Sequence, residues 1–261
     1  MSVMEAKSIS IVFGGLKAVT NFDLKLGKGE LVGLIGPNGA GKTTVFNMLT
    51  GVYSPTSGDI VLNTSREGHN YKSIIKLKPY QITQSGVART FQNIRLFKDL
   101  SVLDNVRIAF HFNVKYNALQ GILRTTAFYN EEDEITEKAR DLLKIFNLQD
   151  KEKELAKNLP YGEQRKLEIT RALATNPKVL LLDEPAAGMN PQETHDLMNL
   201  ISFIRNKFDL TILLIEHDMS LVMGICERIV VLDYGQTIAV GTPEQISKDP
   251  KVIKAYLGEG V

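Results

Sequence analysis

The sequence lacks the features that mark several classes of protein, and each absence excludes or disfavours one class. Cys226 is the only cysteine among 261 residues, which excludes a disulfide framework and a thiolate metal site. Its apolar neighbours Val222, Ile225 and Ile229 indicate a small core residue. The charges nearly cancel, with 31 basic and 30 acidic side chains, so the composition does not favour a protein dedicated to nucleic acids.

Long apolar runs are also missing. No segment approaches the roughly 20 apolar residues that span a bilayer, and residues 1–7 lack the apolar stretch of a signal peptide. The longest apolar runs, 179–182 and 212–215, are short and predict buried strands. We therefore expect a cytosolic protein, which would need a partner to hold it at a membrane.

What the sequence does contain is a glycine-rich loop directly after the apolar run 31–35. The loop reads Gly36, Pro37, Asn38, Gly39, Ala40, Gly41, Lys42, Thr43 and Thr44, and it matches the phosphate-binding pattern G-x-x-x-x-G-K-[ST]. Its glycines permit turns in which successive N–H groups point into one concavity. A helix from about residue 42 to 51 would aim its positive end at the same place. Lys42 would lie near the β- and γ-phosphates, and Thr43 would ligate Mg²⁺.

Two carboxylates lie at the carboxyl end of a second predicted buried strand, 179–183. The run ends in Asp183-Glu184-Pro185, and open α/β sheets bind ligands at the carboxyl ends of their strands. Asp183 is suited to hold Mg²⁺ through water and Glu184 to act on an attacking water, although a strand end leading into a capped loop gives the same pattern. With the glycine-rich loop, this pair predicts binding and hydrolysis of a nucleoside triphosphate.

The rest of the chain predicts an α/β protein with an insertion. Antiparallel strands are expected at 8–13 and 19–26, and residues 93–158 read as helical, with a helix at about 133–147. After about residue 163 helices and strands alternate: the predicted helices are 163–175, 191–208 and 219–226, and the predicted strands 179–183, 211–215 and 228–232.

One further segment makes the interpretation specific. About twenty residues before Glu184 comes a segment of Leu159, Pro160, Tyr161, Gly162 and Glu163, which is followed by a predicted helix. This segment resembles the signature segment of ATP-binding-cassette (ABC) ATPases, and the resemblance covers nearly the whole chain in the right order. It implies that Phe13 stacks on adenine, that Gln92 senses Mg²⁺ and couples to a transport partner, and that His217 is the switch histidine near the γ-phosphate.

Within that family, residues 13–19, 89–93 and 184–191 resemble the LivG-type ATPase of branched-chain amino-acid importers. The signature departs from the general pattern. Pro160 stands where a serine usually contacts the γ-phosphate, and it offers neither a hydroxyl nor a backbone N–H. Tyr161 and Glu163 likewise replace a glycine and a glutamine. We therefore expect Gly162 and the helix start at Glu163 to contribute more to nucleotide contact than Pro160.

The resemblance implies a P-loop NTPase (RecA-like) core with an N-terminal antiparallel β subdomain and an inserted α-helical subdomain. Residues 1–92 and 171–261 would form the core, and 93–170 the helical insertion that ends in the signature segment. The expected cofactors are ATP and Mg²⁺, with Thr43, Gln92 and Asp183 as the metal ligands. Catalysis would fall to Glu184, His217 and Lys42.

The same resemblance implies the partners. A second ABC ATPase subunit, identical or homologous, would supply its signature in trans. Integral-membrane permease subunits and an extracytoplasmic substrate-binding protein would complete the complex, at the cytoplasmic face of the membrane and without nucleic acid.

Three alternatives stay open or are weighed against this interpretation. A lipid-export ABC ATPase is the nearest rival. A non-transport ABC ATPase acting on ribosomes or DNA is disfavoured, because the chain has one cassette, no heptads and almost no net charge. The run 206–209 spells the guanine-reading N-K-x-D, but it closes a predicted helix rather than following a strand. For single residues, Phe13 could be a core aromatic, and His217 a strand-end histidine bonded to backbone.

Overall fold

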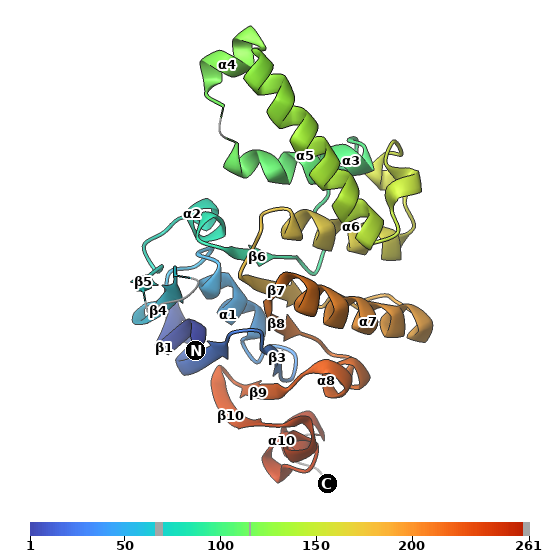
Figure 1. The fold of residues 1–261 in the computed structure, drawn as a ribbon. Helices are drawn as coiled ribbons and strands as arrows, with labels where there is room; N and C mark the ends of the chain where they lie inside the picture. The colour runs from blue at the N-terminus through green and yellow to red at the C-terminus, as the bar shows by residue number, and fades with distance from the viewer. Residues whose placement is uncertain (66–69, 115, 258–261) are drawn as a thin grey trace. The chain divides into compact units, whose positions relative to one another are not determined.

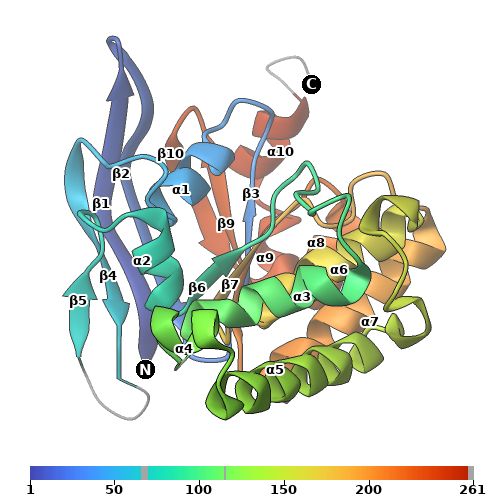
Figure 2. The same cartoon turned by 90° about the horizontal axis from the view of Figure 1, so that it is seen from above.

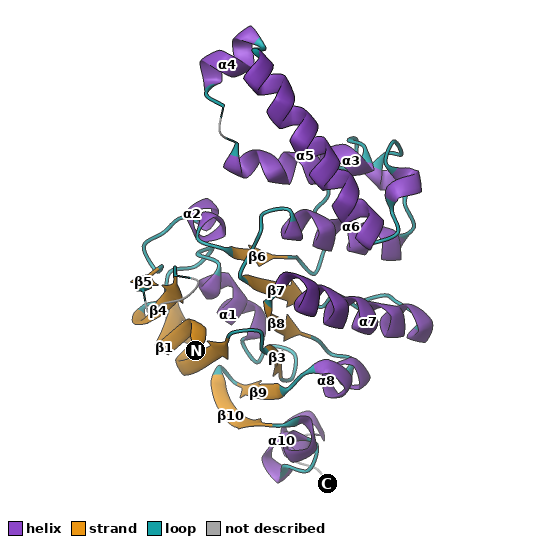
Figure 3. Ribbon diagram, viewed as in Figure 1, coloured by secondary structure: helices purple, strands orange, loops and turns teal. Residues whose placement is uncertain are grey.

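The computed structural model describes residues 1–65, 70–114 and 116–257, and the chain forms two compact units. Residues 1–92 and 178–261 make the first unit, and residues 93–177 the second (Figure 1). The predicted α/β class is confirmed, with an antiparallel sheet and a largely parallel sheet in the first unit (Figure 3).

The antiparallel sheet has the order β2-β1-β4-β5. Its strands are β1 (Ser2–Phe13), β2 (Leu16–Gly27), β4 (Ser57–Asn63) and β5 (Tyr71–Ser73). The β1–β2 hairpin turns at Gly14 and Gly15, both with positive φ, and its pairing extends to Ser2 opposite Gly27. The hairpin is therefore longer than predicted, since its strands were expected only at 8–13 and 19–26. Strand β5 lies in a polar segment, for which the sequence predicted no strand.

The second sheet has the order β10-β9-β3-β8-β7-β6 and is parallel except for its β9–β10 edge pair. The strands are β3 (Leu31–Ile35), β6 (Val87–Arg89), β7 (Val179–Asp183), β8 (Thr211–Ile215), β9 (Arg228–Asp233) and β10 (Gln236–Gly241). All residues of β3, β7 and β8 are buried, because central parallel strands are covered on both faces. These three strands have the predicted bounds.

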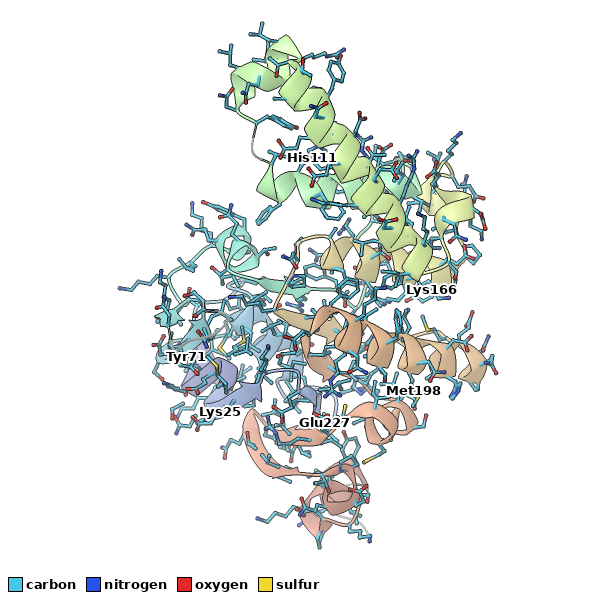
Figure 4. The ribbon with its side chains drawn as sticks, viewed as in Figure 1. Lys25, Tyr71, His111, Lys166, Met198 and Glu227 are labelled. Carbon is cyan, nitrogen blue, oxygen red and sulfur yellow. The ribbon has the colours of Figure 1, made fainter. Side chains whose placement is uncertain are left out.

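Helices cover this sheet on both faces. The helices of the first unit are α1 (Lys42–Leu49), α2 (Pro79–Gln84), α7 (Pro191–Phe208), α8 (Met219–Ile225), α9 (Pro243–Ile246) and α10 (Pro250–Leu257). Helix α1 lies between the two sheets, where Phe46 joins a core cluster with Phe22 and Val230 (Figure 2). Helices α7 and α8 run side by side on the other face, with Met198 against Gly224 (Figures 1 and 4).

The second unit is helical. It contains α3 (Val102–Phe110), α4 (Ala118–Leu123), α5 (Thr126–Ile145) and α6 (Tyr161–Leu173), with short 3₁₀ turns at His111–Asn113, Gln149–Lys151 and Ala156–Asn158. Helix α5 begins at Thr126 rather than at 133, because the Thr125 hydroxyl accepts the Phe128 N–H and caps it. The unit runs to Pro177, since α6 continues past the boundary expected at 170.

In the part of the chain that the structure describes, no helix is long and apolar enough to cross a membrane.

The single thiol lies in the core of the first unit. Cys226 is buried at the end of α8, and an added Cβ on Gly33 of β3 would lie only 3.1 Å from its Sγ. Burial raises the pKa of Cys226 to about 12, so the side chain behaves as a small hydrophobe, as expected from its neighbours.

Candidate nucleotide site

Apart from Phe13, the predicted site residues of the first unit lie at the carboxyl ends of four neighbouring parallel strands. The glycine-rich loop follows β3, Gln92 follows β6, Asp183 ends β7, and His217 comes two residues after β8. The carboxyl ends of parallel strands meet at one edge of the sheet, so four separate segments of the sequence converge there.

The loop needs glycine at both of its ends. Gly36 has φ +151°, and a Cβ there would lie 2.0 Å from the carbonyl oxygen of Leu232. Gly41 has φ +104°, and its Cβ would lie 2.9 Å from the carbonyl oxygen of Ala18. Gly39, with φ +81°, faces open space, so only its backbone conformation favours glycine. The loop is pressed against neighbouring backbone at its ends and open at its middle.

Backbone hydrogen bonds fix the loop to the two sheets. Gly235, in the β9–β10 turn, donates its N–H to Ala40 (2.9 Å) and accepts from Thr20 of β2 (2.8 Å). Helix α1 starts at Lys42 with Gly41 as its N-cap, and no side chain of the described residues caps it. The first N–H groups of the helix and the positive end of its dipole therefore face the loop, which is the arrangement that binds phosphate. Among the loop side chains Asn38 and Thr43 are exposed, Pro37 and Thr44 half-buried, and Ala40 buried.

Lys42 lies inside the loop with only 6% of its surface exposed. Its Nζ donates to the carbonyl oxygens of Gly36 (2.7 Å) and Pro37 (2.9 Å). Burial lowers the pKa of Lys42, and the nearby carboxylates of Glu184 and Asp183 act in the opposite direction. The loop and the strand-end carboxylates therefore face one another across one site.

Glu184 is held by two side chains from neighbouring strand ends. Its Oε1 lies 2.9 Å from Nε2 of His217, and its Oε2 accepts from Nε2 of Gln92 at 2.7 Å. An ionised carboxylate only accepts hydrogen bonds, so a neutral His217 in this contact carries its proton on Nε2. The backbone of Glu184 is left-handed, with φ +46°, and its N–H donates to Ile215 at the end of β8. A strained conformation held by several contacts is typical of functional positions.

Asp183 lies in a buried ion pair that the sequence did not predict. Its Oδ2 is 2.7 Å from Nη2 of Arg89, and the two side chains are 4% and 6% exposed. Arg89 also donates from Nη1 to Asn47 of α1 (2.7 Å), and its guanidinium lies over the rings of Phe46 and Phe91. A charged residue ending the apolar run Val87-Ala88 was the available signal for Arg89.

A second residue that the sequence reasoning missed is Glu216, which is 3% exposed. Its Oε1 accepts the N–H of Ala186 (2.6 Å), and its Oε2 accepts the N–H groups of His217 (3.0 Å) and Asp218 (3.5 Å). Burial raises the pKa of Glu216, and these backbone donors act to lower it. A carboxylate between the buried strand β8 and His217 was the signal available in the sequence.

Phe13 lies at the tip of the β1–β2 hairpin and is not a core residue. Phe13 is 42% exposed, and its ring meets Tyr53 edge to face, with centroids 5.2 Å apart. An aromatic ring with an accessible face can stack on a base. The sequence reasoning did not include Tyr53, which fixes the orientation of this ring.

The signature residues belong to the second unit. Leu159 is buried, and Pro160 is the N-cap of α6, again without a side-chain cap among the described residues. Tyr161 is exposed and Gly162 half-buried, while Glu163 forms an ion pair with Lys151 at 2.6 Å. The Pro160 and Tyr161 side chains are thus the accessible part of this segment.

The residues expected to hold Mg²⁺ fit that ion chemically. Thr43, Asp183 and Gln92 supply hydroxyl, carboxylate and amide oxygens, which are the hard ligands that Mg²⁺ prefers. No cluster of three or more His, Cys, Asp or Glu side chains that could hold a metal occurs among the described residues. A single buried carboxylate suits an ion that is bound largely through substrate phosphates.

A glycine-rich phosphate loop between strand and helix, facing a strand-end carboxylate pair, defines a P-loop nucleotide-binding protein. A sequence profile described as "ABC transporter" matches residues 19–187, and a second, "Branched-chain amino acid ATP-binding cassette transporter", matches residues 236–261. The chain belongs to the ABC transporter family.

Known relatives extend this result over the whole chain. The high-affinity branched-chain amino acid transport ATP-binding protein LivG of Salmonella typhimurium is 49% identical over 257 residues, which cover 98% of each chain. The lipopolysaccharide export system ATP-binding protein LptB of Haemophilus influenzae is 34% identical over 259 residues, covering 99% of this chain and 98% of LptB. A crystal structure of an ATP-binding cassette of an ABC transporter, in its ADP conformation, matches with a TM-score of 0.83 at 31% identity, covering 99% of this chain and all of the other.

Proposed function

We propose that this chain is the ATP-binding and hydrolysing subunit of an importer for branched-chain amino acids. The relatives named for branched-chain amino acid transport are 48–49% identical to it, against 33–34% for the lipopolysaccharide-export relatives. The C-terminal match to the branched-chain amino acid profile, over residues 236–261, favours the same choice. Lipid export is the second candidate, and the cargo experiment below separates the two.

The phosphate loop binds the triphosphate of ATP. The open middle of the loop at Gly39 and the uncapped start of α1 offer backbone N–H groups and a positive dipole to the phosphates. Lys42 adds a buried positive charge near the β- and γ-phosphates, where negative charge develops during transfer. Phe13, with its accessible ring, stacks on the adenine.

Thr43, Asp183 and Gln92 would hold Mg²⁺, which neutralises charge on the phosphates when it is bound. Arg89 holds Oδ2 of Asp183 and so fixes the orientation of this carboxylate toward the loop.

Glu184 accepts a proton from the attacking water. Gln92 and His217 hold both of its carboxylate oxygens, so the base is oriented before the reaction begins. His217 also stabilises the charge that develops on the γ-phosphate. The observation that carries this proposal is the convergence of Glu184, Gln92 and His217 beside the buried Lys42.

A second subunit would complete this site. Leu159, Pro160, Tyr161, Gly162 and Glu163 of a second ATPase subunit, identical or homologous, would close over the γ-phosphate. Phe91, which precedes Gln92 in the sequence, lines a hollow of about 130 Å³ together with residues such as Thr50 and Pro79. This hollow is suited to receive part of a permease subunit. With an extracytoplasmic substrate-binding protein, this complex would hold the chain at the cytoplasmic face of the membrane.

The catalytic part is tested with Glu184→Gln in the purified full-length protein. We expect ATP affinity within about threefold of the wild type and hydrolysis lowered by about 10²- to 10⁴-fold, because the general base is lost. Glu137→Gln, an exposed carboxylate on α5, is the control and should hydrolyse ATP at the wild-type rate. Wild-type turnover by Glu184→Gln would show that another group activates the water.

The cargo is tested in cells that lack this gene. Uptake of radiolabelled leucine, isoleucine and valine should fall, and it should return with the wild-type gene but not with Glu184→Gln. Unchanged uptake, together with altered lipopolysaccharide at the cell surface, would support lipid export instead.

A further inference from the structure

Glu216 is a buried carboxylate that none of the steps above uses, although it lies one residue from His217. With 3% of its surface exposed, its charge must be balanced by hydrogen bonds, and the structure gives it three backbone donors. Those donors come from two different loops. Ala186 follows β7, and His217 and Asp218 follow β8.

The two loops are those that carry the reacting groups. Glu184 lies two residues before Ala186 on the first loop, and it meets His217 of the second loop at 2.9 Å. That side-chain contact is short, partly exposed and easily lost, since the His217 side chain is 41% exposed. The contact of Glu216 with Ala186 is buried and joins the two loops, and its contacts with His217 and Asp218 are partly buried.

Each carboxylate oxygen serves one loop. Oε1 accepts from Ala186 at 2.6 Å, while Oε2 accepts from His217 at 3.0 Å and from Asp218 at 3.5 Å. Because Glu216 itself belongs to the second loop, the Oε1 contact joins the two loops and the Oε2 contacts fix the side chain on its own loop, and a side chain with only one accepting oxygen cannot make both. Hydrogen bonds of N–H groups to a carboxylate are about twice as strong as neutral ones, so the charge matters as well as the shape.

We propose that Glu216 is a positioning residue for ATP hydrolysis, which sets the distance between Glu184 and His217 by tying their two loops together through Ala186 and His217. The inference rests on the proposed function, because Glu184 and His217 must be the reacting groups. The contacts of Glu216 are to backbone N–H groups of the two loops. It acts on the rate through the geometry of the other two residues.

The variant Glu216→Gln separates this role from simple stabilisation. Glutamine keeps the size of the side chain but offers one acceptor, and its amide N–H groups face a backbone donor where the second oxygen was. The variant therefore loses either the contact to Ala186, which joins the loops, or the contacts that fix the side chain on its own loop. Because misplacement of a catalytic group by about 1 Å costs about 10²-fold in rate, we expect kcat to fall roughly 10- to 100-fold. The phosphate loop is not part of this contact, so the KM for ATP and the equilibrium affinity for ATP should stay within about twofold.

Glu30→Gln is the matched control. Glu30 accepts from the N–H of Gly27 (2.8 Å) and pairs with Arg228 (2.7 Å), so it too is a partly buried carboxylate with a backbone donor. It lies just before β3, at the amino end of that strand, whereas the site is at the carboxyl end. Its loss should lower the melting temperature without lowering kcat.

The experiment measures kcat, KM and the melting temperature of the full-length wild type, Glu216→Gln and Glu30→Gln, with ATP affinity measured separately. A fall in kcat confined to Glu216→Gln supports the proposal. A folded Glu216→Gln with wild-type kcat overturns it, and so does an equal loss of kcat in Glu30→Gln.

If Glu216→Gln does not fold, Glu216→Asp serves instead. Aspartate keeps the charge and both oxygens but is one methylene shorter, so it cannot span the same two loops and should show the same selective fall in kcat. A wild-type kcat for Glu216→Asp overturns the proposal. A wild-type protein that hydrolyses no ATP overturns the proposed function and this inference with it, whereas a wild type that hydrolyses ATP beside an unimpaired variant refutes the inference alone.

Discussion

Replacing Arg89 by methionine should destabilise the first unit strongly, because it leaves a buried charge without a partner. The Arg89 and Asp183 side chains are 6% and 4% exposed, and their charged atoms are 2.7 Å apart. Removing one partner of a buried ion pair costs about 3–5 kcal/mol. Methionine keeps apolar contact between the rings of Phe46 and Phe91, so most of the cost of Arg89→Met should come from the lost charge rather than from a cavity.

At about 2–4 °C of melting temperature per kcal/mol for a unit of this size, Arg89→Met should melt roughly 10 °C below the wild type. The double variant Arg89→Met/Asp183→Asn gives the sharper result. With both charges gone, the total loss should be smaller than the sum of the two single losses by about 2 kcal/mol or more.

Thermal and denaturant unfolding of the four proteins measure this coupling, with Arg140→Met, whose ion pair with Glu152 is more exposed, as a control that should melt close to the wild type. Additive losses, or a loss below about 1 kcal/mol for Arg89→Met alone, would refute the reasoning that Asp183 depends on Arg89 for its charge balance.

Three further predictions concern the loop, acid stability and the signature. Gly36→Ala should cost more than about 3 kcal/mol of stability and abolish ATP binding, because its Cβ would lie 2.0 Å from a backbone oxygen. Gly39→Ala, in open space, should cost about 1–2 kcal/mol of stability. Melting curves and ATP titrations measure both variants, and equal effects would contradict the geometry. The pKa of Glu30 lies below its usual 4.5: burial acts to raise it, but the hydrogen bonds from Arg228 and Gly27 and the charge of Arg228 outweigh burial. Its stabilisation is thus present above pH 4.5 and is lost as the pH falls through the lower folded pKa, so Glu30→Gln should show a smaller loss of stability between pH 5 and pH 3 than the wild type, as measured by denaturant titration at each pH. Pro160→Ser should raise ATP turnover up to about tenfold, since a hydroxyl that can reach the γ-phosphate adds one charge-assisted hydrogen bond; an unchanged rate would mean that this signature already works fully without it.

The central elements could be predicted from the sequence because their signals are local. Strands β3, β7 and β8 consist mainly of apolar runs, and α7 begins where Asn190 and Pro191 supply a cap and a first-turn proline, so the predicted bounds agree with the structure. Helix α2 was missed because it has only six residues and starts after Lys78, which is not a usual capping residue. Its capping box uses Gln81 instead.

In the site, too, the residues with a local signal in the sequence could be predicted and the others could not. The sequence named Lys42, Gln92, Glu184 and His217, because each has a motif or a strand end that marks it, and the structure brings them together. Arg89 and Glu216 could not be assigned, since their partners Asp183 and Ala186 lie far from them in the sequence. Their contacts arise only when strand order is known, and periodicity does not give strand order.

The buried Cys226 makes this chain a ready host for site-specific probes. Because its thiol is held in the core with a pKa of about 12, thiol reagents at neutral pH should leave it unmodified in the native state. A cysteine introduced on an exposed position would then be the single reactive group, without prior mutation of the natural one. Pairs of fluorescent or spin labels attached in this way could follow the approach and separation of two subunits through a cycle of ATP binding and hydrolysis.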